Sequence, residues 1–185
     1  MNRKGTILIL AVLCTALLGC PQSISRTDGG GVLFYTASFN GVPVTVSVNN
    51  AMDTNGGLVQ IGTINLALIV KNPNAGASSL MTVNVESYEV TFNRADTGTR
   101  TPPKLVRAIF GAVNAGGTLT FNNLPIMTTN QLQHQPLRDL LVDGYDTETN
   151  SEVIVLNVSI RFFGRTLSGD AVETAPVQLT IDFTR

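Results

Sequence analysis

The sequence predicts an all-β protein: an immunoglobulin-like antiparallel β-sandwich of about seven to nine strands, with one short helical crossover near residues 128–142. Apolar side chains alternate with polar ones at a period of two through most of residues 32–185, which is typical of strands with one buried face. Turn signals rich in Gly and Asn recur at short intervals, and one segment has helical spacing. The chain lacks Trp and a disulfide within this region, which excludes a true antibody-type domain but not the wider architecture.

Eight runs have the pattern of strands. The last run, V-Q-L-T-I-D-F-T, is the clearest, because its apolar and polar residues alternate without a break. Asn40-Gly41 predicts a hairpin between the first two runs, and Ser168-Gly169 predicts a hairpin turn before the last. The expected strands are 32–39, 42–49, 58–71, 80–92, 104–113, 118–122, 153–163 and 177–184.

The run 80–92 changes phase along its length. Apolar residues alternate up to Val85, and the alternation resumes from Tyr88. One extra residue at Glu86-Ser87 would return the apolar side chains to the same face, so we predict a β-bulge there. Further along, Asn114-Ala-Gly-Gly117 predicts the turn that links the runs on either side of it.

The helical crossover is predicted by a cap and an apolar stripe. Thr128-x-x-Gln131 resembles a capping box, in which the side chain of each residue accepts a hydrogen bond from the backbone N–H of the other. Leucines follow at helical spacing, but Pro136 interrupts the segment because proline cannot continue a helix. We therefore expect two short helical turns that end at Gly144.

The N-terminus has the pattern of an export signal. Arg3 and Lys4 precede an apolar run from Thr6 to Leu18, which is 13 residues long. A membrane-spanning helix needs about 20 apolar residues, so this run fits the core of a cleavable signal peptide instead. The residues that follow, Leu17-Leu18-Gly19-Cys20, resemble the lipobox of bacterial lipoproteins.

The lipobox resemblance implies that residues 1–19 are removed and that Cys20 receives a diacylglyceryl group through its nucleophilic thiolate. The partner implied is the membrane, held by acyl chains on Cys20. An ordinary signal peptide cleaved elsewhere is the alternative. Residues 20–31 would form a flexible tether, and residues 32–185 a single β-sandwich domain. In Gram-negative lipoproteins, an Asp directly after the lipidated Cys resembles an inner-membrane retention signal. Pro21 occupies that position here, which favours the outer membrane of the cell envelope.

Composition excludes several classes of function. Loss of Arg3 and Lys4 lowers the 12 basic residues to ten against 13 acidic ones, a net charge of −3. The remaining Lys residues are Lys71 and Lys104, so no basic patch suits nucleic acid, and we expect no nucleic-acid partner. Cys14 would leave with the signal peptide, so cysteine catalysis and thiolate metal sites are excluded.

A second resemblance covers residues 64–92. Leu66-Ala-Leu-Ile-Val-Lys-Asn-Pro-Asn74, followed by Ser87-Tyr-Glu-Val-Thr-Phe92, resembles the strand–Asn-Pro–strand core of LEA14-like (water-stress) domains. Those domains are small β-sandwiches, so the resemblance implies a stress-protective function. Alternatively, Asn72-Pro73-Asn74 is simply favourable turn chemistry after a strand.

Candidate catalytic and metal-binding residues are sparse. The single histidine, His134, has no G-x-S-x-G or H-E-x-x-H partner pattern, so we expect a solvated surface side chain. The acidic run contains Asp143, Asp146, Glu148 and Glu152, but its spacing does not match a calcium loop. We expect this run to be a solvated loop, and we predict no catalytic residue, no metal and no cofactor.

These observations favour a non-catalytic binding or assembly module, anchored by lipid, that contacts an envelope protein through its loops. The 93–104 loop, N-R-A-D-T-G-T-R-T-P-P-K, is the longest charged candidate for that contact. The alternatives are a LEA14-like stress-protective domain and, less favoured, a hydrolase that would depend on His134.

Overall fold

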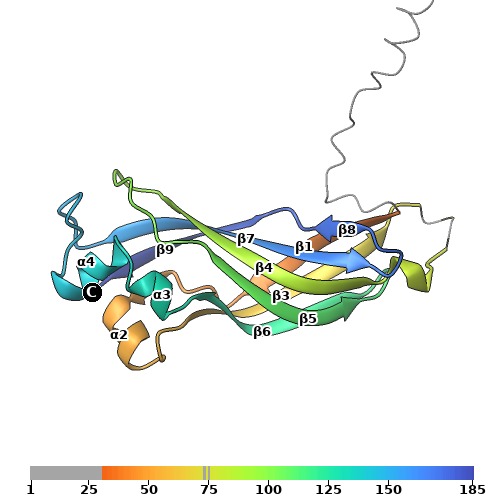
Figure 1. The fold of residues 1–185 in the computed structure, drawn as a ribbon, viewed down its shortest axis with the longest axis horizontal. Helices are drawn as coiled ribbons and strands as arrows, with labels where there is room; N and C mark the ends of the chain where they lie inside the picture. Colours follow the sequence, from red (N-terminus) through yellow and green to blue (C-terminus); the bar gives the residue numbers. More distant parts are fainter. Residues whose placement is uncertain (1–30, 73, 75) are drawn as a thin grey trace, which may run out of the picture.

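Two β-sheets pack face to face in an elongated sandwich (Figure 1). The computed structural model describes residues 31–185 apart from residues 73 and 75. One sheet contains, in order, β1 (Val32–Asn40), β3 (Val59–Val70) and β6 (Thr118–Met127). The other contains β2 (Thr45–Ser47), β9 (Val177–Thr184), β7 (Ile154–Thr166), β4 (Val83–Arg94) and β5 (Leu105–Val113), and β8 (Ala171–Glu173) pairs with β7.

The strand order confirms the predicted fold class. The first strand of the described residues, β1, joins one sheet, and β2 then crosses to the other sheet and pairs in parallel with β9. The other pairs are antiparallel. A sheet of β1, β3 and β6 facing a sheet of β9, β7, β4 and β5 is the arrangement of immunoglobulin-like sandwiches.

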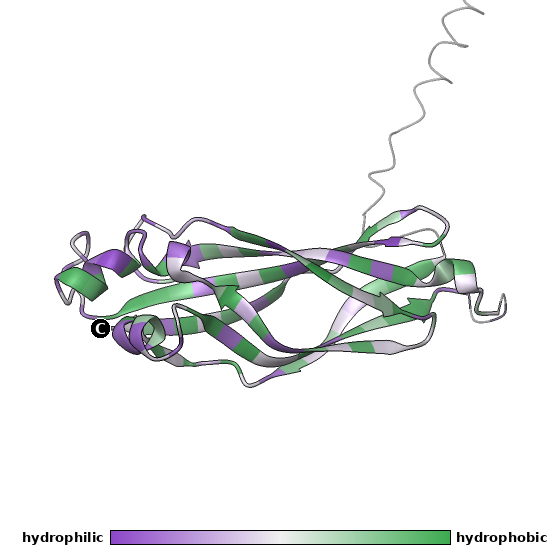
Figure 2. Ribbon diagram, turned by 60° about the horizontal axis from the view of Figure 1, so that its bottom comes forward, coloured by the Kyte–Doolittle hydropathy of each residue, from purple (hydrophilic) through white to green (hydrophobic). Residues whose placement is uncertain are grey.

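Hydrophobic and hydrophilic positions alternate along the strands (Figure 2), and the buried apolar residues of both sheets form the core. Phe34, Phe162 and Phe183 are fully buried between the sheets, where each aromatic ring stabilises the fold by roughly 1.5–3 kcal/mol. Tyr88 of β4 is buried with them, and its hydroxyl donates to the carbonyl of Pro125 on β6 at 2.7 Å. Burial raises the pKa of Tyr88, so this hydroxyl stays protonated and links the two sheets.

The predicted bulge in β4 is confirmed. The register shifts between Val85 and Ser87 in the pairing with both neighbouring strands, β5 and β7. Val85 and Tyr88 are consequently both buried, although they are three positions apart. The bulge keeps one face of this long strand against the core along its whole length.

The predicted hairpin at Asn40-Gly41 is wrong. Gly41 has a φ of +65°, but here it lets two segments of chain cross closely: the Gly62 N–H donates to the Gly41 carbonyl at 3.1 Å. A Cβ on Gly41 would lie 3.0 Å from the Cα of Gly62. The expected strand 42–49 is replaced by the short β2 and by α2 (Val48–Asp53), whose Ser47 hydroxyl accepts from the Asn50 N–H.

The helical crossover has the predicted form. It consists of α3 (Thr129–Leu132) and α4 (Leu137–Val142), separated at Pro136. The Gln131 side chain accepts from the Thr128 backbone N–H at 3.1 Å, as expected of the capping residue. Gly144 ends α4 with a φ of +88°, and its N–H donates to carbonyls of the last turn.

The sandwich has two contrasting ends (Figure 1). The helical end contains α2, α3, α4, the C-terminus and the 93–104 loop. The entry end contains Gly31, the 3-10 helix η2 (Ser79–Met81), the 114–117 turn between β5 and β6, and the 167–170 turn between β7 and β8. Among the described residues, no helix has the length and apolar character needed to cross a bilayer. The predicted signal peptide and Cys20 lie outside the described residues.

Candidate functional site

A buried arginine holds the 93–104 loop at the helical end. Arg94 is near the end of β4, and its Nε and Nη2 atoms bind the two carboxylate oxygens of Asp96 at 2.6 and 2.8 Å. The same Nη2 atom lies 2.9 Å from Oδ2 of Asp146, which is 52 residues further along the chain. The side chains of Arg94 and Asp146 are 3% and 0% exposed, so this is a buried ion pair that joins two loops.

Backbone groups complete the ion pair. Asp96 also accepts hydrogen bonds from the N–H groups of Gly98 and Val155, each at 3.0 Å. Asp146 accepts from the Glu148 N–H at 3.2 Å and from the Thr149 hydroxyl at 2.6 Å. We call this set of Arg94, Asp96 and Asp146 the clamp. Its carboxylates are well supplied with donors, which a buried charge requires.

Both carboxylates of the clamp are stabilised in the ionised form. Burial opposes the ionisation of Asp96, but hydrogen bonds from Arg94 and from two backbone N–H groups outweigh it and lower the pKa. Burial likewise opposes the ionisation of Asp146, and hydrogen bonds from Thr149 and Arg94 lower its pKa below the ordinary value. The clamp is therefore charged at neutral pH.

Gly98 packs directly against the guanidinium of Arg94. A Cβ at position 98 would lie 2.3 Å from Cζ of Arg94, closer than any non-bonded contact allows. The Nη1 atom of Arg94 is buried beneath this loop without a hydrogen-bond partner among the described residues. The loop thus closes over the arginine, and residue 98 has no space for a side chain.

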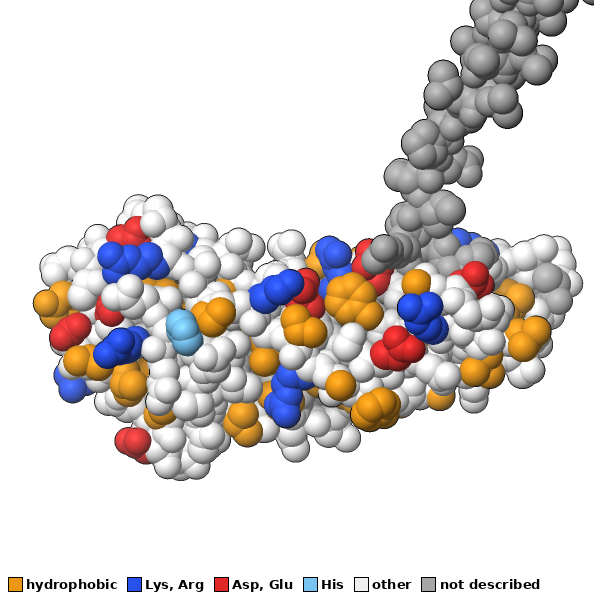
Figure 3. Space-filling model, in the orientation of Figure 1, with side chains coloured by type: hydrophobic (Ala, Val, Ile, Leu, Met, Phe, Trp, Pro, Cys, Tyr) orange, Lys and Arg blue, Asp and Glu red, His pale blue; other side chains and the backbone are white. Residues whose placement is uncertain are grey.

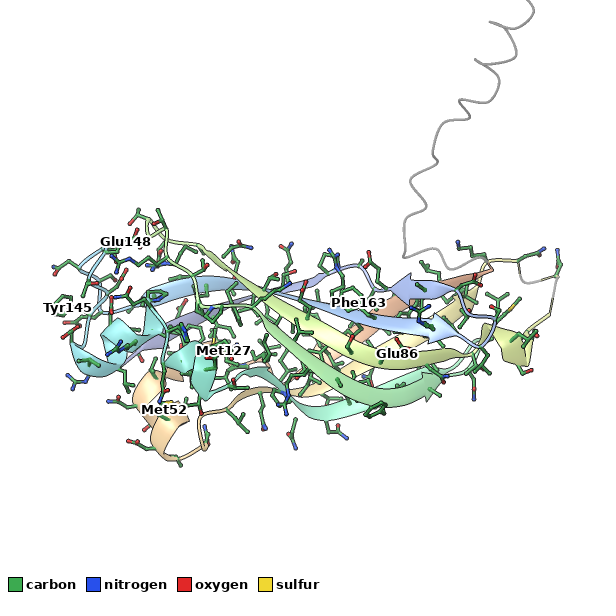
Figure 4. All side chains as sticks on the ribbon, in the orientation of Figure 1. Met52, Glu86, Met127, Tyr145, Glu148 and Phe163 are labelled. Atoms are coloured by element: carbon green, nitrogen blue, oxygen red, sulfur yellow. The ribbon has the colours of Figure 1, made fainter. Side chains whose placement is uncertain are left out.

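Glu148 fastens the tip of the 93–104 loop from outside (Figure 4). Its Oε1 atom accepts from the backbone N–H of Thr99 at 2.9 Å and from the Thr99 hydroxyl. Its Oε2 atom accepts from the Arg100 N–H at 3.1 Å. The Thr99 hydroxyl and these backbone donors lower the pKa of Glu148, so an ionised carboxylate caps the loop.

Asp139 connects α4 to the same loops. It is 5% exposed and accepts from the Thr147 hydroxyl and N–H and from the Gln135 amide. Arg100 bridges the two sides: its Nη1 atom lies 3.2 Å from the Thr147 hydroxyl and 3.7 Å from Oδ2 of Asp139. The 93–104 loop, α4 and the 143–152 loop therefore form one connected polar structure.

An open groove of about 700 Å³ lies between this loop and the helical crossover. Two exposed arginines face it, Arg100 from the loop and Arg138 from α4, together with His134. The charged side chains and the single histidine of the helical end are visible at the left of Figure 3. The residues that line the groove are Arg100, Thr101, Pro103, Gln133, His134, Gln135 and Arg138.

The structure separates the residues of the predicted acidic run. Asp143 and Glu152 are exposed and Glu148 caps the neighbouring loop, whereas Asp146 is fully buried. The expectation of a solvated run is therefore wrong for Asp146, because Arg94 compensates its charge. Among the residues that the structure describes, no three His, Cys, Asp or Glu side chains are arranged to hold a metal ion. His134 is exposed as predicted, and its Nδ1 atom contacts the Asn130 carbonyl.

Sequence reasoning identified the 93–104 loop but not the clamp within it. The N-R-A-D segment places Arg94 two residues before Asp96, which was a local indication of pairing. Nothing in the sequence indicated that Asp146 would join them, since no spacing rule connects residues so far apart in the chain.

A second hollow of about 570 Å³ lies between the β2–α2 segment and β3. Its lining contains polar but no charged side chains, among them Ser47, Asn50, Asn55 and Gln60. Such a surface offers hydrogen bonds without a strong electrostatic preference. The groove beside the 93–104 loop is therefore the better candidate for recognising a partner of defined charge.

Comparisons with protein-family models, with curated proteins and with solved structures gave no match to this chain.

Proposed function

We propose that this chain is a lipid-anchored cell-envelope protein whose β-sandwich is a non-catalytic binding or assembly module. In this proposal Cys20 carries the lipid, and the helical end contacts an envelope protein. The observation that carries the binding function is the clamp, which fixes the 93–104 loop in one conformation beside a groove with two exposed arginines.

A preorganised loop suits a binding surface. Ordering a mobile loop costs about 0.5–1.5 kcal/mol for each side chain immobilised on binding, and a loop that is already fixed avoids much of that cost. The buried ion pair to Asp146 and the cap by Glu148 hold the loop from both sides. Arg100 is 45% exposed at the edge of this rigid loop. Its Nη1 atom already contacts Thr147 and Asp139, so a partner would bind its other guanidinium N–H groups.

The charge of the groove indicates the chemistry of the partner. Arg100 and Arg138 present guanidinium groups, which bind carboxylates through two parallel hydrogen bonds. Since the groove is open and flanked by two arginines, an acidic segment of another envelope protein is the best-fitting ligand. The partner would approach from the side opposite to the point where the chain enters the sandwich.

The proposal is tested by capture of envelope proteins on the lipidated chain. We expect the double variant Arg100→Gln/Arg138→Gln to lose the captured partner. The matched control is Arg161→Gln/Arg165→Gln, which removes two arginines from the outer face of β7 with the same change of net charge.

Equal capture by the wild type, the groove variant and the control would overturn the assignment of the groove. If no partner is captured and deletion of the protein impairs growth only under desiccation, the LEA14-like alternative is favoured. Intact mass of the membrane-extracted protein tests the anchor separately: Cys20 should begin the mature chain with acyl groups attached, and Cys20→Ser should abolish both cleavage and membrane retention.

A further inference from the structure

Two exposed leucines lie side by side at the entry end. Leu80 in η2 is 58% exposed and Leu167 in the turn after β7 is 52% exposed. Their turns are joined by hydrogen bonds: the Ser168 N–H donates to the Leu80 carbonyl at 3.2 Å, and the Leu167 N–H donates to the Thr82 carbonyl at 2.9 Å. The two side chains therefore belong to one small apolar tip rather than to separate loops.

This tip is poor in charge. The sequence contains no charged residue from 72 to 85, and none in the 114–117 turn at the same end. Asp170 is the acidic residue of the neighbouring turn, and its carboxylate accepts a hydrogen bond from the Ser168 hydroxyl at 2.9 Å. At the right extremity of Figure 3, hydrophobic side chains lie among uncharged ones. Few charges would have to be dehydrated if this end met an apolar phase.

The chain enters the sandwich at the same tip. The carbonyl of Gly31 accepts from the Lys71 N–H at 3.0 Å, and a Cβ on Gly31 would lie 3.4 Å from Cε of Met81, the neighbour of Leu80. Cys20 precedes Gly31 by eleven residues, which span at most about 40 Å even when fully extended. A lipid on Cys20 would thus keep this end within about 40 Å of the bilayer, a limit that the tether does not impose on the helical end.

We infer that the entry end docks into the lipid surface, with Leu80 and Leu167 inserted at the boundary between head groups and acyl chains. This inference rests on the proposed lipid attachment at Cys20. The tether raises the local concentration of the tip at the membrane, so that a small apolar contact suffices. Contact at this end orients the long axis of the sandwich away from the bilayer and presents the 93–104 loop to partners.

The absence of Trp from the chain permits a direct test. Leu80→Trp and Leu167→Trp each introduce a single indole at the tip, and Val142→Trp introduces one at the helical end, where Val142 is 61% exposed. The lipidated full-length variants are reconstituted into vesicles of phosphatidylethanolamine and phosphatidylglycerol with brominated acyl chains, which quench indole fluorescence on contact.

We expect quenching at least about twofold stronger for Leu80→Trp and Leu167→Trp than for Val142→Trp, because interfacial groups enter the bilayer by roughly 5–10 Å. Intact mass is measured first on every sample. Acylated protein with equal quenching at all three positions overturns the inference and leaves the proposed anchor intact. Protein without acyl groups on Cys20 overturns both.

Discussion

The connections between strands at the two ends of the sandwich differ in their chemistry. At the entry end, β5 joins β6 through residues 114–117 and β7 joins β8 through residues 167–170, and neither turn contains a buried charge. At the helical end, β4 ends in the buried Arg94, and the connection from β6 to β7 contains two buried aspartates, Asp139 and Asp146. The difference between the two ends therefore lies in the loops and strand ends.

This difference indicates which loops do more than connect strands. At the entry end, four-residue turns close the β5–β6 and β7–β8 pairs, whereas the connection from β3 to β4 is longer and contains η2. Burying a charge costs several kcal/mol unless it is paired, and the clamp pairs the buried charges of Arg94 and Asp146. The Nη1 atom of Arg94 is the exception, since it has no hydrogen-bond partner among the described residues. A costly, rigid loop beside an arginine-lined groove is consistent with recognition, whereas a plain apolar tip is consistent with contact to lipid.

The largest expected effect comes from removing the arginine of the clamp. Arg94→Met would leave Asp146 buried without its counter-ion, so we expect the free energy of unfolding to fall by about 3–5 kcal/mol. Urea unfolding of residues 20–185 measures this. Arg100→Met is the matched control, because Arg100 is 45% exposed and should change stability by only about 0–1 kcal/mol. Equal losses from both variants would show that the clamp has no special role.

A smaller effect is expected from crowding the clamp. Gly98→Ala would place a methyl group 2.3 Å from Cζ of Arg94, and we expect a loss of about 1–3 kcal/mol from the forced rearrangement. The control, Thr97→Ala, lies next to it on an exposed part of the loop. Equal melting temperatures for Gly98→Ala and Thr97→Ala would contradict the close packing of this loop on the guanidinium.

Acid should weaken the fold through the two aspartates of the clamp. The pKa of Asp96 and that of Asp146 are lowered in the folded protein, so the unfolded state binds protons first as the pH falls. Their stabilising contribution is present above the ordinary aspartate pKa of about 3.9 and is lost as the pH falls through the folded-state pKa. As the pH is lowered from neutral through the pKa of the folded carboxylates, the free energy of unfolding of Asp96→Asn should therefore fall less than that of the wild type. An identical acid dependence for both proteins, measured by urea unfolding across the pH range, would argue against this source of stability.

The smallest effect is expected at the apolar tip. Leu80→Ser replaces a side chain that is 58% exposed, so stability should change by less than about 0.5 kcal/mol. Vesicle binding of the lipidated variant should nevertheless become more sensitive to dilution. A large loss of stability would mean that Leu80 supports the fold instead of the membrane contact.

Local patterns in the sequence predicted much of the fold. The bulge at Glu86-Ser87, the cap at Thr128 and the stop at Gly144 each depend on neighbours a few residues away, and all three are present. The hairpin at Asn40-Gly41 failed because its conformation is set by the distant Gly62. Local turn chemistry identifies where the chain bends, but it does not identify the strand that follows.

The candidate site was less predictable for the same reason. The 93–104 loop was recognised by its length and charge, but Asp146, which pairs with Arg94 from another loop, is 52 residues away in the sequence. Phe110 shows a further limit of local patterns: it lies on the predicted strand 104–113, yet its side chain is 87% exposed on β5. Alternation predicts that neighbouring side chains face opposite ways, and an aromatic residue can fall on either face.

Photocrosslinking in cells from two positions tests most directly whether the two ends have different partners. A photoreactive residue replacing Thr101 in the groove should form an adduct with an envelope protein, and one replacing Leu80 at the entry end should form adducts with lipid. Protein adducts from Leu80 with lipid adducts from Thr101, or the same products from both positions, would contradict the assignment of the helical end to a protein and the entry end to the membrane.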